Sequence, residues 1–239
     1  MAVNLPIVQE RVHFKGASKA RNYGAKKAKS SFIAFPDDDC LYPYKLIENI
    51  IKLFELDVKV DTILTAKIKP SEIHKSFYET GLSYLPITSP LGLFKAKAET
   101  SNIFTRKSVL ESLSYVFNES IGPGANTPWA SNEGTDLLIR LLKQGTCIIK
   151  LKELSIAHHS SQGSPAKSLK YGMGRFEIIS THELGAGIYM INLFQPIARY
   201  LKNPKPYNLL VCISTMLGRP GMINLVYKLF NSRINYNSR

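Results

Sequence analysis

The sequence predicts an α/β protein with a mixed, mainly parallel sheet and a basic, mostly helical C-terminal extension. Up to about residue 151, short apolar runs suited to buried strands alternate with amphipathic runs suited to helices, and this alternation favours a parallel sheet. Further on, charge-free stretches of 13 to 15 residues are flanked by Lys and Arg. We therefore expect a sheet domain over residues 1–155 and a helical region over residues 156–239.

The charge of the chain is high and unevenly distributed. Residues 1–136 carry 17 Lys/Arg and 15 Asp/Glu, whereas residues 137–239 carry 14 Lys/Arg and 3 Asp/Glu. The net charge of +13 indicates an anionic partner, which is a membrane surface, a nucleic acid or a phosphorylated substrate. We do not expect nucleic acid, because no element interleaves basic residues with aromatic ones along one face.

Cysteine usage and hydropathy indicate a cytoplasmic setting. Cys40, Cys147 and Cys212 lie far apart and form no metal-ligand spacing, and nothing in the sequence suggests a disulfide framework. Residues 1–11 lack the apolar core of a signal peptide. No run reaches the roughly 20 apolar residues that are needed to span a bilayer.

The stretch Gly16–Pro43 organises the predicted domain. Good helix formers dominate Ser18–Lys29, and Ser18 is placed to cap the first turn. The apolar run Ser31–Phe35 is suited to a buried strand. Pro36 ends this strand because it has no N–H to donate. Three carboxylates follow at once, namely Asp37, Asp38 and Asp39.

Adjacent carboxylates repel one another, so three of them at the end of a buried strand indicate a bound cation. Mg²⁺ and Mn²⁺ take oxygen ligands and usually also contact substrate phosphates. Ligands of open α/β sheets lie at the ends of parallel strands. The residues leave one alternative open, a solvated acidic turn that caps the helix beginning at Pro43.

The other elements up to residue 155 are expected from periodicity and turn residues. In order they are strand 5–12, helix 43–56, strand 61–68, a long loop 71–98, strand 101–106, helix 108–115, a Gly/Pro-rich loop 117–131, helix 135–144 and strand 146–151. A long loop beside a candidate site is often a substrate-binding element.

Two carboxylates and the only tryptophan lie around the last predicted helix of this domain. Glu133 and Asp136 stand at its start, where they suit the helix dipole; alternatively, Glu133 points into a cleft as a general base. Trp129, in the preceding loop, is either a stacking platform for a sugar or base or a loop anchor buried in the core.

Candidate metal and phosphate contacts follow the last predicted strand. His158 and His159 lie in a polar loop that can supply one metal ligand, or they are simply exposed. Lys170 and Arg175 belong to a basic, Gly-containing patch that either clamps a diphosphate or lipid phosphate or forms a solvated helix surface. The C-terminal apolar stretches suit helices that lie in a membrane interface, or the core-facing helices of a small subdomain.

Four segments, in this order, resemble the motifs of family 2 glycosyltransferases, which have the GT-A fold with a Rossmann-like sheet. KGASKARNYGAKKAKSSFIAFPDDDCLYPYKL at 15–46 resembles the family's Ala-Arg-Asn block leading into its Asp-x-Asp motif. Residues 101–125 resemble its acceptor-side strand, helix and loop. NEGTDLLIRLLKQG at 132–145 resembles the acidic segment that opens the catalytic helix, and YGMGRFEI at 171–178 resembles a Tyr-Gly-x-Gly element of membrane-associated members.

The resemblance implies inverting transfer of a sugar from a nucleotide sugar, a UDP- or GDP-sugar, with Mn²⁺ or Mg²⁺ as cofactor. It implies that the metal is held by Asp37 and Asp39, with His158 or His159 within reach. The donor would contact Arg21, Asn22, Asp37 and Asp38.

The resemblance also implies an acidic base on the acceptor side. Glu133 would deprotonate the acceptor hydroxyl, and because Gly134 stands where the family has a second acid, Asp136 is the alternative base. Trp129, Lys170 and Arg175 are the candidates for acceptor or phosphate binding.

The implied role is synthesis of a cell-surface polysaccharide on a glycan or lipid-linked acceptor. The enzyme would be cytoplasmic and peripheral on the inner face of the cell membrane, bound to its anionic surface. The family's first strand and the next helix and strand, which bind the nucleotide base, have no counterpart before Leu5, so we expect an N-terminally truncated domain. The alternative is a non-catalytic remnant or subunit that binds a membrane and needs a partner chain to complete the nucleotide site.

Overall fold

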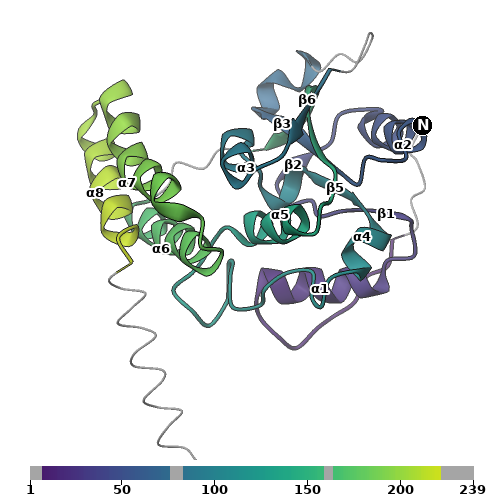
Figure 1. The fold of residues 1–239 in the computed structure, drawn as a ribbon, viewed down its shortest axis with the longest axis horizontal. Helices are drawn as coiled ribbons and strands as arrows, with labels where there is room; N and C mark the ends of the chain where they lie inside the picture. The colour runs from purple at the N-terminus through teal and green to yellow at the C-terminus, as the bar shows by residue number, and fades with distance from the viewer. Residues whose placement is uncertain (1–6, 76–82, 159–163, 222–239) are drawn as a thin grey trace, which may run out of the picture.

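A computed structural model describes residues 7–75, 83–158 and 164–221, and it shows a mixed sheet with helices on both faces (Figure 1). The strands are β1 (Phe32–Ala34), β2 (Cys40–Leu41), β3 (Thr62–Ile68), β4 (Tyr84–Ile87), β5 (Ile103–Arg106) and β6 (Ile148–His158). The helices are α1 (Ala17–Lys27), α2 (Leu46–Leu56), α3 (Pro90–Ala96), α4 (Lys107–Glu111), α5 (Glu133–Lys143), α6 (Pro165–Thr181), α7 (Gly185–Lys202) and α8 (Pro206–Gly218). Two 3₁₀ turns, η1 (Pro70–Lys75) and η2 (Thr100–Asn102), precede β4 and β5.

The sheet is mixed, and the expectation of a mainly parallel sheet is wrong for the described residues. The strand order is β1-β5-β3-β6-β2, with β4 also paired to β6. Only β3 and β6 pair in parallel among the described strands. The strand–helix–strand pattern of β1, α2 and β3 does make β1 and β3 parallel to each other, but β5 lies between them and is antiparallel to both.

Alternation along the strands divides the core between the two faces of the sheet. On one face, Ile63 of β3 and Ile149 of β6 pack with the apolar side of α2. On the other face, Leu64 of β3 and Ile148 of β6 pack with α5. Successive strand residues point to opposite faces, so neighbouring residues of β3 and β6 serve different clusters.

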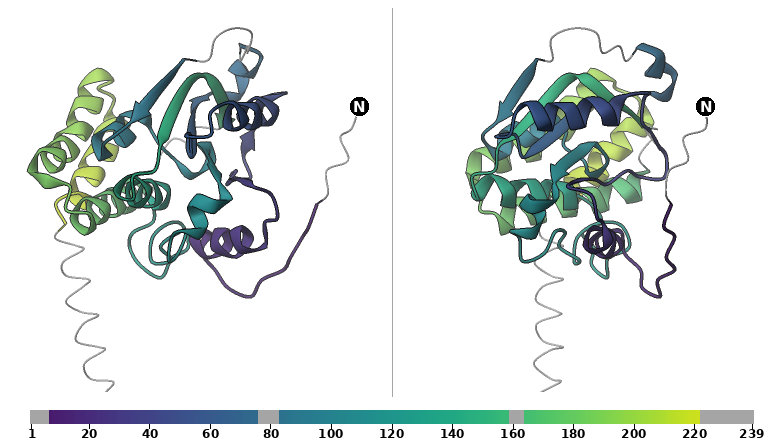
Figure 2. Two further views of the ribbon diagram at one scale, coloured as in Figure 1. Left: turned by 45° about the vertical axis from the view of Figure 1, so that its right-hand side comes forward. Right: turned by 90° about the vertical axis from the view of Figure 1, so that its right-hand side faces the viewer.

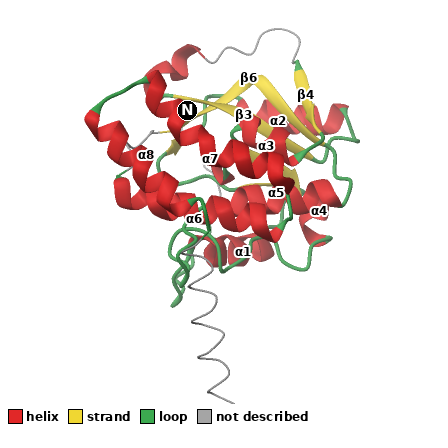
Figure 3. Ribbon diagram, turned by 60° about the vertical axis from the view of Figure 1, so that its left-hand side comes forward, coloured by secondary structure: helices red, strands yellow, loops and turns green. Residues whose placement is uncertain are grey.

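Helices α6, α7 and α8 lie together at the end of the molecule away from α2 (Figures 1 and 2). Figure 3 shows them packed against one another beside the sheet. Met173 and Ile178 of α6 belong to the same core cluster as α5, so α6 is continuous with the sheet domain. None of the described helices combines the length and the apolar character that crossing a bilayer requires.

The glycines of the Tyr-Gly-x-Gly segment sit at two close approaches of α6. A Cβ on Gly172 would lie 2.8 Å from the carbonyl oxygen of Thr215 in α8. A Cβ on Gly174 would lie 2.7 Å from the carbonyl oxygen of Ser131, in the loop before α5. Gly218 of α8 approaches the backbone of Leu169 in the same way. These positions let α6 pack closely on α8 and on the α5 loop at once.

The segment 71–98, expected to be a loop, contains η1, β4 and α3. The periodicity did not show β4 because it is a short edge strand with Pro86 inside, which edge strands tolerate. The residues at the start of α3 do carry a sequence signal for a helix. Ser89 caps it by accepting a hydrogen bond from the Gly92 N–H at 3.2 Å, and Pro90 occupies the first turn.

Two further expectations differ from the structure at strand ends. Residues 7–12 contain no strand, and the rest of the expected strand 5–12 lies outside the described residues. Strand β6 continues to His158 instead of ending at residue 151, because Ile156 and Ala157 pair with β3. His158 is therefore a strand residue and not part of a polar loop.

Candidate functional site

The first cluster of the candidate site lies where β2 meets the end of β6. These strands pair in antiparallel register with Cys40 opposite His158. The His158 Nε2 lies 3.2 Å from Asp39 Oδ1 and 3.6 Å from Asp37 Oδ2. Together with the Cys40 sulfur, one ligand atom from each residue falls within 4.8 Å of all the others. The cluster sits beside the carboxyl ends of the parallel pair β3 and β6, the usual ligand edge of an α/β sheet.

The donor set of this cluster fits a divalent cation. Two carboxylates and an imidazole suit Mn²⁺ well, and the carboxylates suit Mg²⁺. Burial raises the pKa of the Cys40 thiol, and the charges of Asp37 and Asp39 raise it further, so this thiol is protonated at neutral pH in the metal-free protein. Asp37, Asp39 and His158 are therefore the better ligands.

The two other residues predicted beside this cluster are placed differently. Asp38 is exposed and outside the cluster, with no bonded partner among the described residues. His159 lies outside the described residues.

Arg21 of α1 connects the cluster to a second acidic group. Its Nη2 donates to Asp37 Oδ1 at 2.7 Å, and its Nη1 donates to Glu133 Oε1 at 2.9 Å. Asp37 thus offers one oxygen to Arg21 and turns the other towards His158. A single guanidinium, lying over the Phe117 ring, fixes the spacing between the candidate cation site and Glu133.

Glu133 is the first residue of α5 and is only 7% exposed. Its Oε1 accepts from Arg21 and, at 3.3 Å, from the Thr100 hydroxyl. Its Oε2 has no hydrogen-bond donor among the described residues and faces Gly122, where a Cβ would come within 3.2 Å. The absence of a side chain at Gly122 keeps this oxygen approachable.

Gly134 explains why a second acid does not follow Glu133. A Cβ at this position would lie 2.9 Å from the Thr100 backbone nitrogen and 3.1 Å from its hydroxyl oxygen. The start of α5 packs directly on η2, so no side chain fits there. The same contact brings the Thr100 hydroxyl to Glu133.

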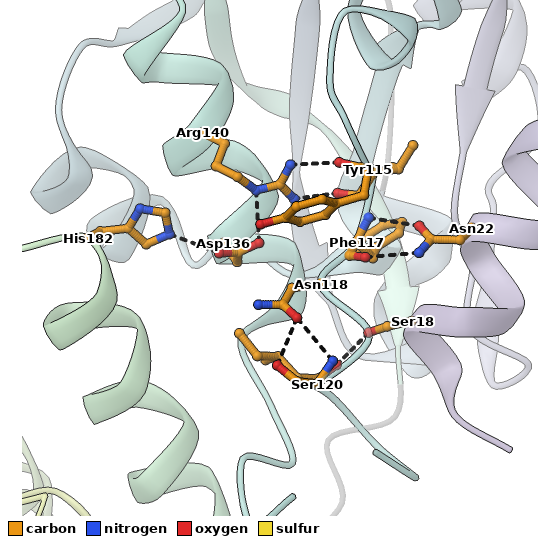
Figure 4. Close-up of polar contacts among 11 residues, drawn as sticks. Ser18, Asn22, Tyr115, Phe117, Asn118, Ser120, Asp136, Arg140 and His182 are labelled. Atoms are coloured by element: carbon orange, nitrogen blue, oxygen red, sulfur yellow. Dashed lines mark hydrogen bonds and ion pairs between the residues drawn. The ribbon is translucent and has the colours of Figure 1, made fainter. Parts of the chain in front are cut away.

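Asp136, the alternative base, belongs to a buried ion-pair network (Figure 4). It is 2% exposed, accepts from Arg140 Nε at 3.0 Å, and lies 2.8 Å from His182 Nε2. Arg140 also donates to the carbonyl oxygens of Tyr115 and Val116. Both oxygens of Asp136 are thereby occupied in joining α5, α6 and the 115–116 loop, which argues against proton transfer to a substrate.

Asn22 was expected to contact the donor, but its amide holds the loop after α4 (Figure 4). Its Nδ2 donates to the Phe117 carbonyl oxygen at 2.9 Å, and its Oδ1 accepts from the Phe117 N–H at 2.8 Å. Ser18, expected as a helix cap, instead donates to the Ile121 carbonyl oxygen at 2.5 Å. Helix α1 therefore anchors the loop that carries Gly122 to Glu133.

The acceptor-side candidates are dispersed. Trp129 is 8% exposed and packs in the core cluster of α5, the position of a loop anchor. Lys170 is exposed on α6. Arg175 is partly buried, with its guanidinium 4.1 Å from the centre of the Phe94 ring.

Sequence reasoning missed Thr100 and Gly122, which hold or border Glu133. No motif marks either residue, and their roles depend on contacts between segments far apart in the chain. An open hollow of about 390 Å³, lined by Asp61, Ser108 and Gln144 among others, lies at the opposite end of β3 from the aspartates and contains none of the predicted residues.

The chain is similar to several solved structures, and the match to TarS shows a shared fold. At a TM-score of 0.55 and 15% identity, the chain is similar to S. aureus TarS 1-349 in complex with UDP-GlcNAc, with 89% of this chain and 63% of that chain covered. A mannosyltransferase, PcManGT from Pyrobaculum calidifontis, in complex with GDP-Man and Mn²⁺, matches with a TM-score of 0.46 and 11% identity over 91% of this chain and 59% of that one. A mycobacterial protein matches with a TM-score of 0.47 and 12% identity over 76% and 56%.

The chain thus spans 56% to 63% of the length of these structures. No curated protein matches the chain. Residues 7–110 match the model of the family described as Glycosyl transferase family 2. This match contains α1, β1 and the aspartate run of the cation cluster, whereas His158 and Glu133 lie beyond it. Residues 7–110 are therefore similar in sequence to family 2 glycosyl transferases, and the chain shares its fold with TarS.

Proposed function

We propose that this chain transfers a sugar from a nucleotide-diphosphate sugar to a glycan or lipid-linked acceptor, with a divalent metal and with inversion at the sugar. The observation that carries the proposal is the Arg21 bridge, which joins Asp37 of the cation cluster to Glu133. It sets a candidate metal site and a candidate base at a fixed spacing. TarS, which shares the fold, was solved with UDP-GlcNAc, and we extend that class of donor to this chain.

On the donor side, Asp37, Asp39 and His158 would hold Mn²⁺ or Mg²⁺. Such an ion, when bound, supplies Lewis-acid stabilisation of the leaving diphosphate. The protein's own contribution is orientation, because the β2–β6 pairing fixes His158 opposite Cys40, and Arg21 fixes Asp37.

On the acceptor side, Glu133 is the base that we propose. An inverting transfer needs one group to take the proton of the attacking hydroxyl. Arg21 and Thr100 both bind Oε1, which locks the carboxylate orientation and leaves Oε2 for that proton. Asp136 instead positions α5, through Arg140 and His182.

We also propose that the helical region binds the inner face of an anionic membrane, as synthesis of a cell-surface polysaccharide requires. Four apolar side chains on α7 are exposed at helical spacing, namely Met190, Phe194, Ile197 and Leu201. Leu210, Ile213 and Leu217 form a similar exposed row on α8. Basic residues lie near these rows, including Lys202 and Lys205, a combination typical of interfacial helices.

The first prediction tests the cation site. Purified protein with a UDP- or GDP-sugar and Mn²⁺ is expected to release nucleoside diphosphate. Asp39→Ala should lower that rate by more than about 100-fold, since even outer partners of metal ligands contribute 10–100-fold. Chelation should abolish release and Mn²⁺ should restore it.

The control for this experiment is Glu55→Ala, which removes an exposed carboxylate on α2 outside the cluster and should change little. Equal rates for Asp39→Ala and the unaltered protein would contradict the cation site. Failure of the unaltered protein to bind any nucleotide, measured by calorimetry, would favour the non-catalytic alternative.

A further inference from the structure

Three arginines from different parts of the helical region converge beside α3. Arg219, the residue after α8, is 4% exposed and donates to the Asn192 carbonyl oxygen and, at 3.3 Å, to Gln195 Oε1 of α7. Arg199 follows Gln195 by four residues, so it lies on the same face of α7. Arg175 of α6 lies over the Phe94 ring of α3. We call these three residues the arginine cluster.

The position of Arg219 next to α6 follows from the glycine contacts. Gly218 packs on the backbone of Leu169 and Met173, and Gly221 packs on the Phe176 ring. Arg219 lies between these two glycines and is therefore held against the turn of α6 that carries Arg175. The cluster thus rests on backbone packing of α6 against the end of α8.

The cluster has no acidic partner in the part of the chain that the structure describes. None of the ion pairs among the described residues involves Arg175, Arg199 or Arg219. In the sequence from residue 159 to residue 239 the only carboxylate side chains are those of Glu177 and Glu183. Thr181 donates to Glu177 at 3.2 Å. Three cations without a counter-charge repel one another in a partly buried place.

The pKa values of the buried arginines reflect the same excess of positive charge. Burial, and then the charge of Arg199, lowers the pKa of Arg175 to about 10. Burial, and then the charges of Arg175 and Arg199, lowers the pKa of Arg219 to about 9. Both groups still carry their charge at neutral pH. In addition, Arg175 Nη1 and Arg219 Nε are buried without a hydrogen-bond acceptor among the described residues, a costly arrangement for charged donors.

We propose that the arginine cluster is a binding site for a phosphate group, carried by the acceptor as a phosphate ester or diphosphate. Phosphate oxygens would supply the missing counter-charge and accept from the two unpaired arginine N–H groups, and planar guanidinium groups match phosphate geometry. Arg199 is exposed and marks the entry. This deepens the proposed function and rests on it for naming the acceptor, whereas phosphate binding itself is tested without donor or metal.

The cluster and the apolar rows face different directions. At 100° per residue, Arg199 lies about opposite to Phe194, Ile197 and Leu201 on α7. A bilayer on the apolar row would therefore not place its head groups at the cluster. We expect phosphate to bind from solution, and we expect this binding to be separable from attachment to a membrane.

The experiment compares thermal unfolding of the full chain in inorganic phosphate or pyrophosphate with chloride at matched ionic strength. A ligand that binds only the folded state raises the unfolding temperature, so phosphate should stabilise the unaltered protein more than chloride does. Arg199→Gln and Arg175→Gln should remove most of this difference. Lys202→Gln, which removes an equal charge from the same end of α7, should keep it.

A second measurement separates binding from ordinary packing. Without phosphate, Arg199→Gln should raise the unfolding temperature, because it relieves repulsion, whereas loss of a structural contact would lower it. Equal phosphate effects in Arg199→Gln and Lys202→Gln, or equal effects of phosphate and chloride, would overturn the proposal. Because Arg199 is exposed, its variant remains informative even if Arg175→Gln does not fold.

Vesicle binding distinguishes a phosphate group taken from solution from the phosphate of a lipid head group. Co-sedimentation with phosphatidylglycerol vesicles should be the same for Arg199→Gln and for the unaltered protein if the cluster takes a phosphate from solution. A loss confined to Arg199→Gln would overturn the solution assignment and point to a lipid head group. If the unaltered protein releases nucleoside diphosphate but does not bind phosphate, only the proposal for the arginine cluster is contradicted. If it binds phosphate but releases no nucleoside diphosphate, only the proposed sugar transfer is contradicted.

Discussion

Arg21 decides the geometry at the residue scale. It gives one N–H group to Asp37 and another to Glu133, and both contacts are shorter than 3 Å. The planar, forked guanidinium presents its donors in a fixed geometry and so holds the two carboxylates at a set spacing. Asp37 of the cation cluster and Glu133 are almost one hundred residues apart in the chain, and this side chain is their direct link.

One variant of each residue distinguishes the proposed roles of Glu133 and Asp136. Glu133→Gln should lower sugar transfer by about 10²–10⁴-fold, the usual contribution of a general base, without loss of nucleotide binding. Asp136→Asn should instead lower the free energy of unfolding by about 3–5 kcal/mol, because it breaks a buried pair and leaves Arg140 uncompensated. The measurements are transfer assays and denaturant unfolding of both variants. A folded Asp136→Asn protein without transfer activity would move the base to Asp136.

A glycine pair tests the packing beside Glu133. Gly134→Ala should lower the free energy of unfolding by about 1–3 kcal/mol, because its Cβ meets the Thr100 backbone. Gly24→Ala is the matched control inside α1. Its Cβ meets nothing within 4 Å, so the better helix former should stabilise the protein by about 0.5–1 kcal/mol. Denaturant unfolding measures the change in the free energy of unfolding for both variants. No change for Gly134→Ala would refute the steric account.

At this scale, the site residues that could be predicted from the sequence are those whose surroundings are set by adjacent residues in the chain. The aspartates follow a strand that the sequence shows clearly, so the run Asp37–Asp39 was located without the structure. The hydrogen bonds of Asn22 and Ser18 were not predicted, because their partners lie in a loop about one hundred residues away. Thr100 was missed for the same reason, since its hydroxyl meets Glu133 through tertiary packing.

At the scale of elements, long amphipathic helices were predictable and short edge elements were not. The apolar spacing of α2 and α5 appears directly in the sequence, and their bounds came within a few residues. Strand β4 has four residues with a proline inside and depends on β6 for its hydrogen bonds. Such a strand is specified by its partner rather than by its own pattern.

The apolar row on α7 supports a prediction about membranes. Leu201→Gln should reduce co-sedimentation with anionic vesicles by roughly tenfold, because burying a leucine side chain contributes about 1.5–3 kcal/mol. Leu56→Gln on α2 is the control, since that leucine is 87% exposed and Leu201 is 69% exposed. Binding should weaken with salt, as screened charges require. Equal sedimentation of the two variants would count against the interfacial row.

For the whole molecule, the contacts of α6 bear on how the chain is divided. A boundary after residue 155 was expected, where the charge pattern changes. Met173 and Ile178 of α6 nevertheless share a core cluster with α5, and His182 reaches the buried Asp136. The change in charge after residue 155 describes the surface of the protein. Whether the two regions unfold together depends instead on these buried contacts. We infer that α6 folds with the sheet.

The lone tryptophan makes this inference measurable. Trp129 packs in the core cluster of α5, so its fluorescence follows the sheet domain, whereas far-ultraviolet circular dichroism is weighted towards helices, including α6, α7 and α8. If α6 unites the two regions, both signals should change at the same denaturant concentration. Met173→Ala should shift both by the same amount, with a loss of about 2–5 kcal/mol. Two separate transitions, with only one moved by Met173→Ala, would restore the boundary after residue 155.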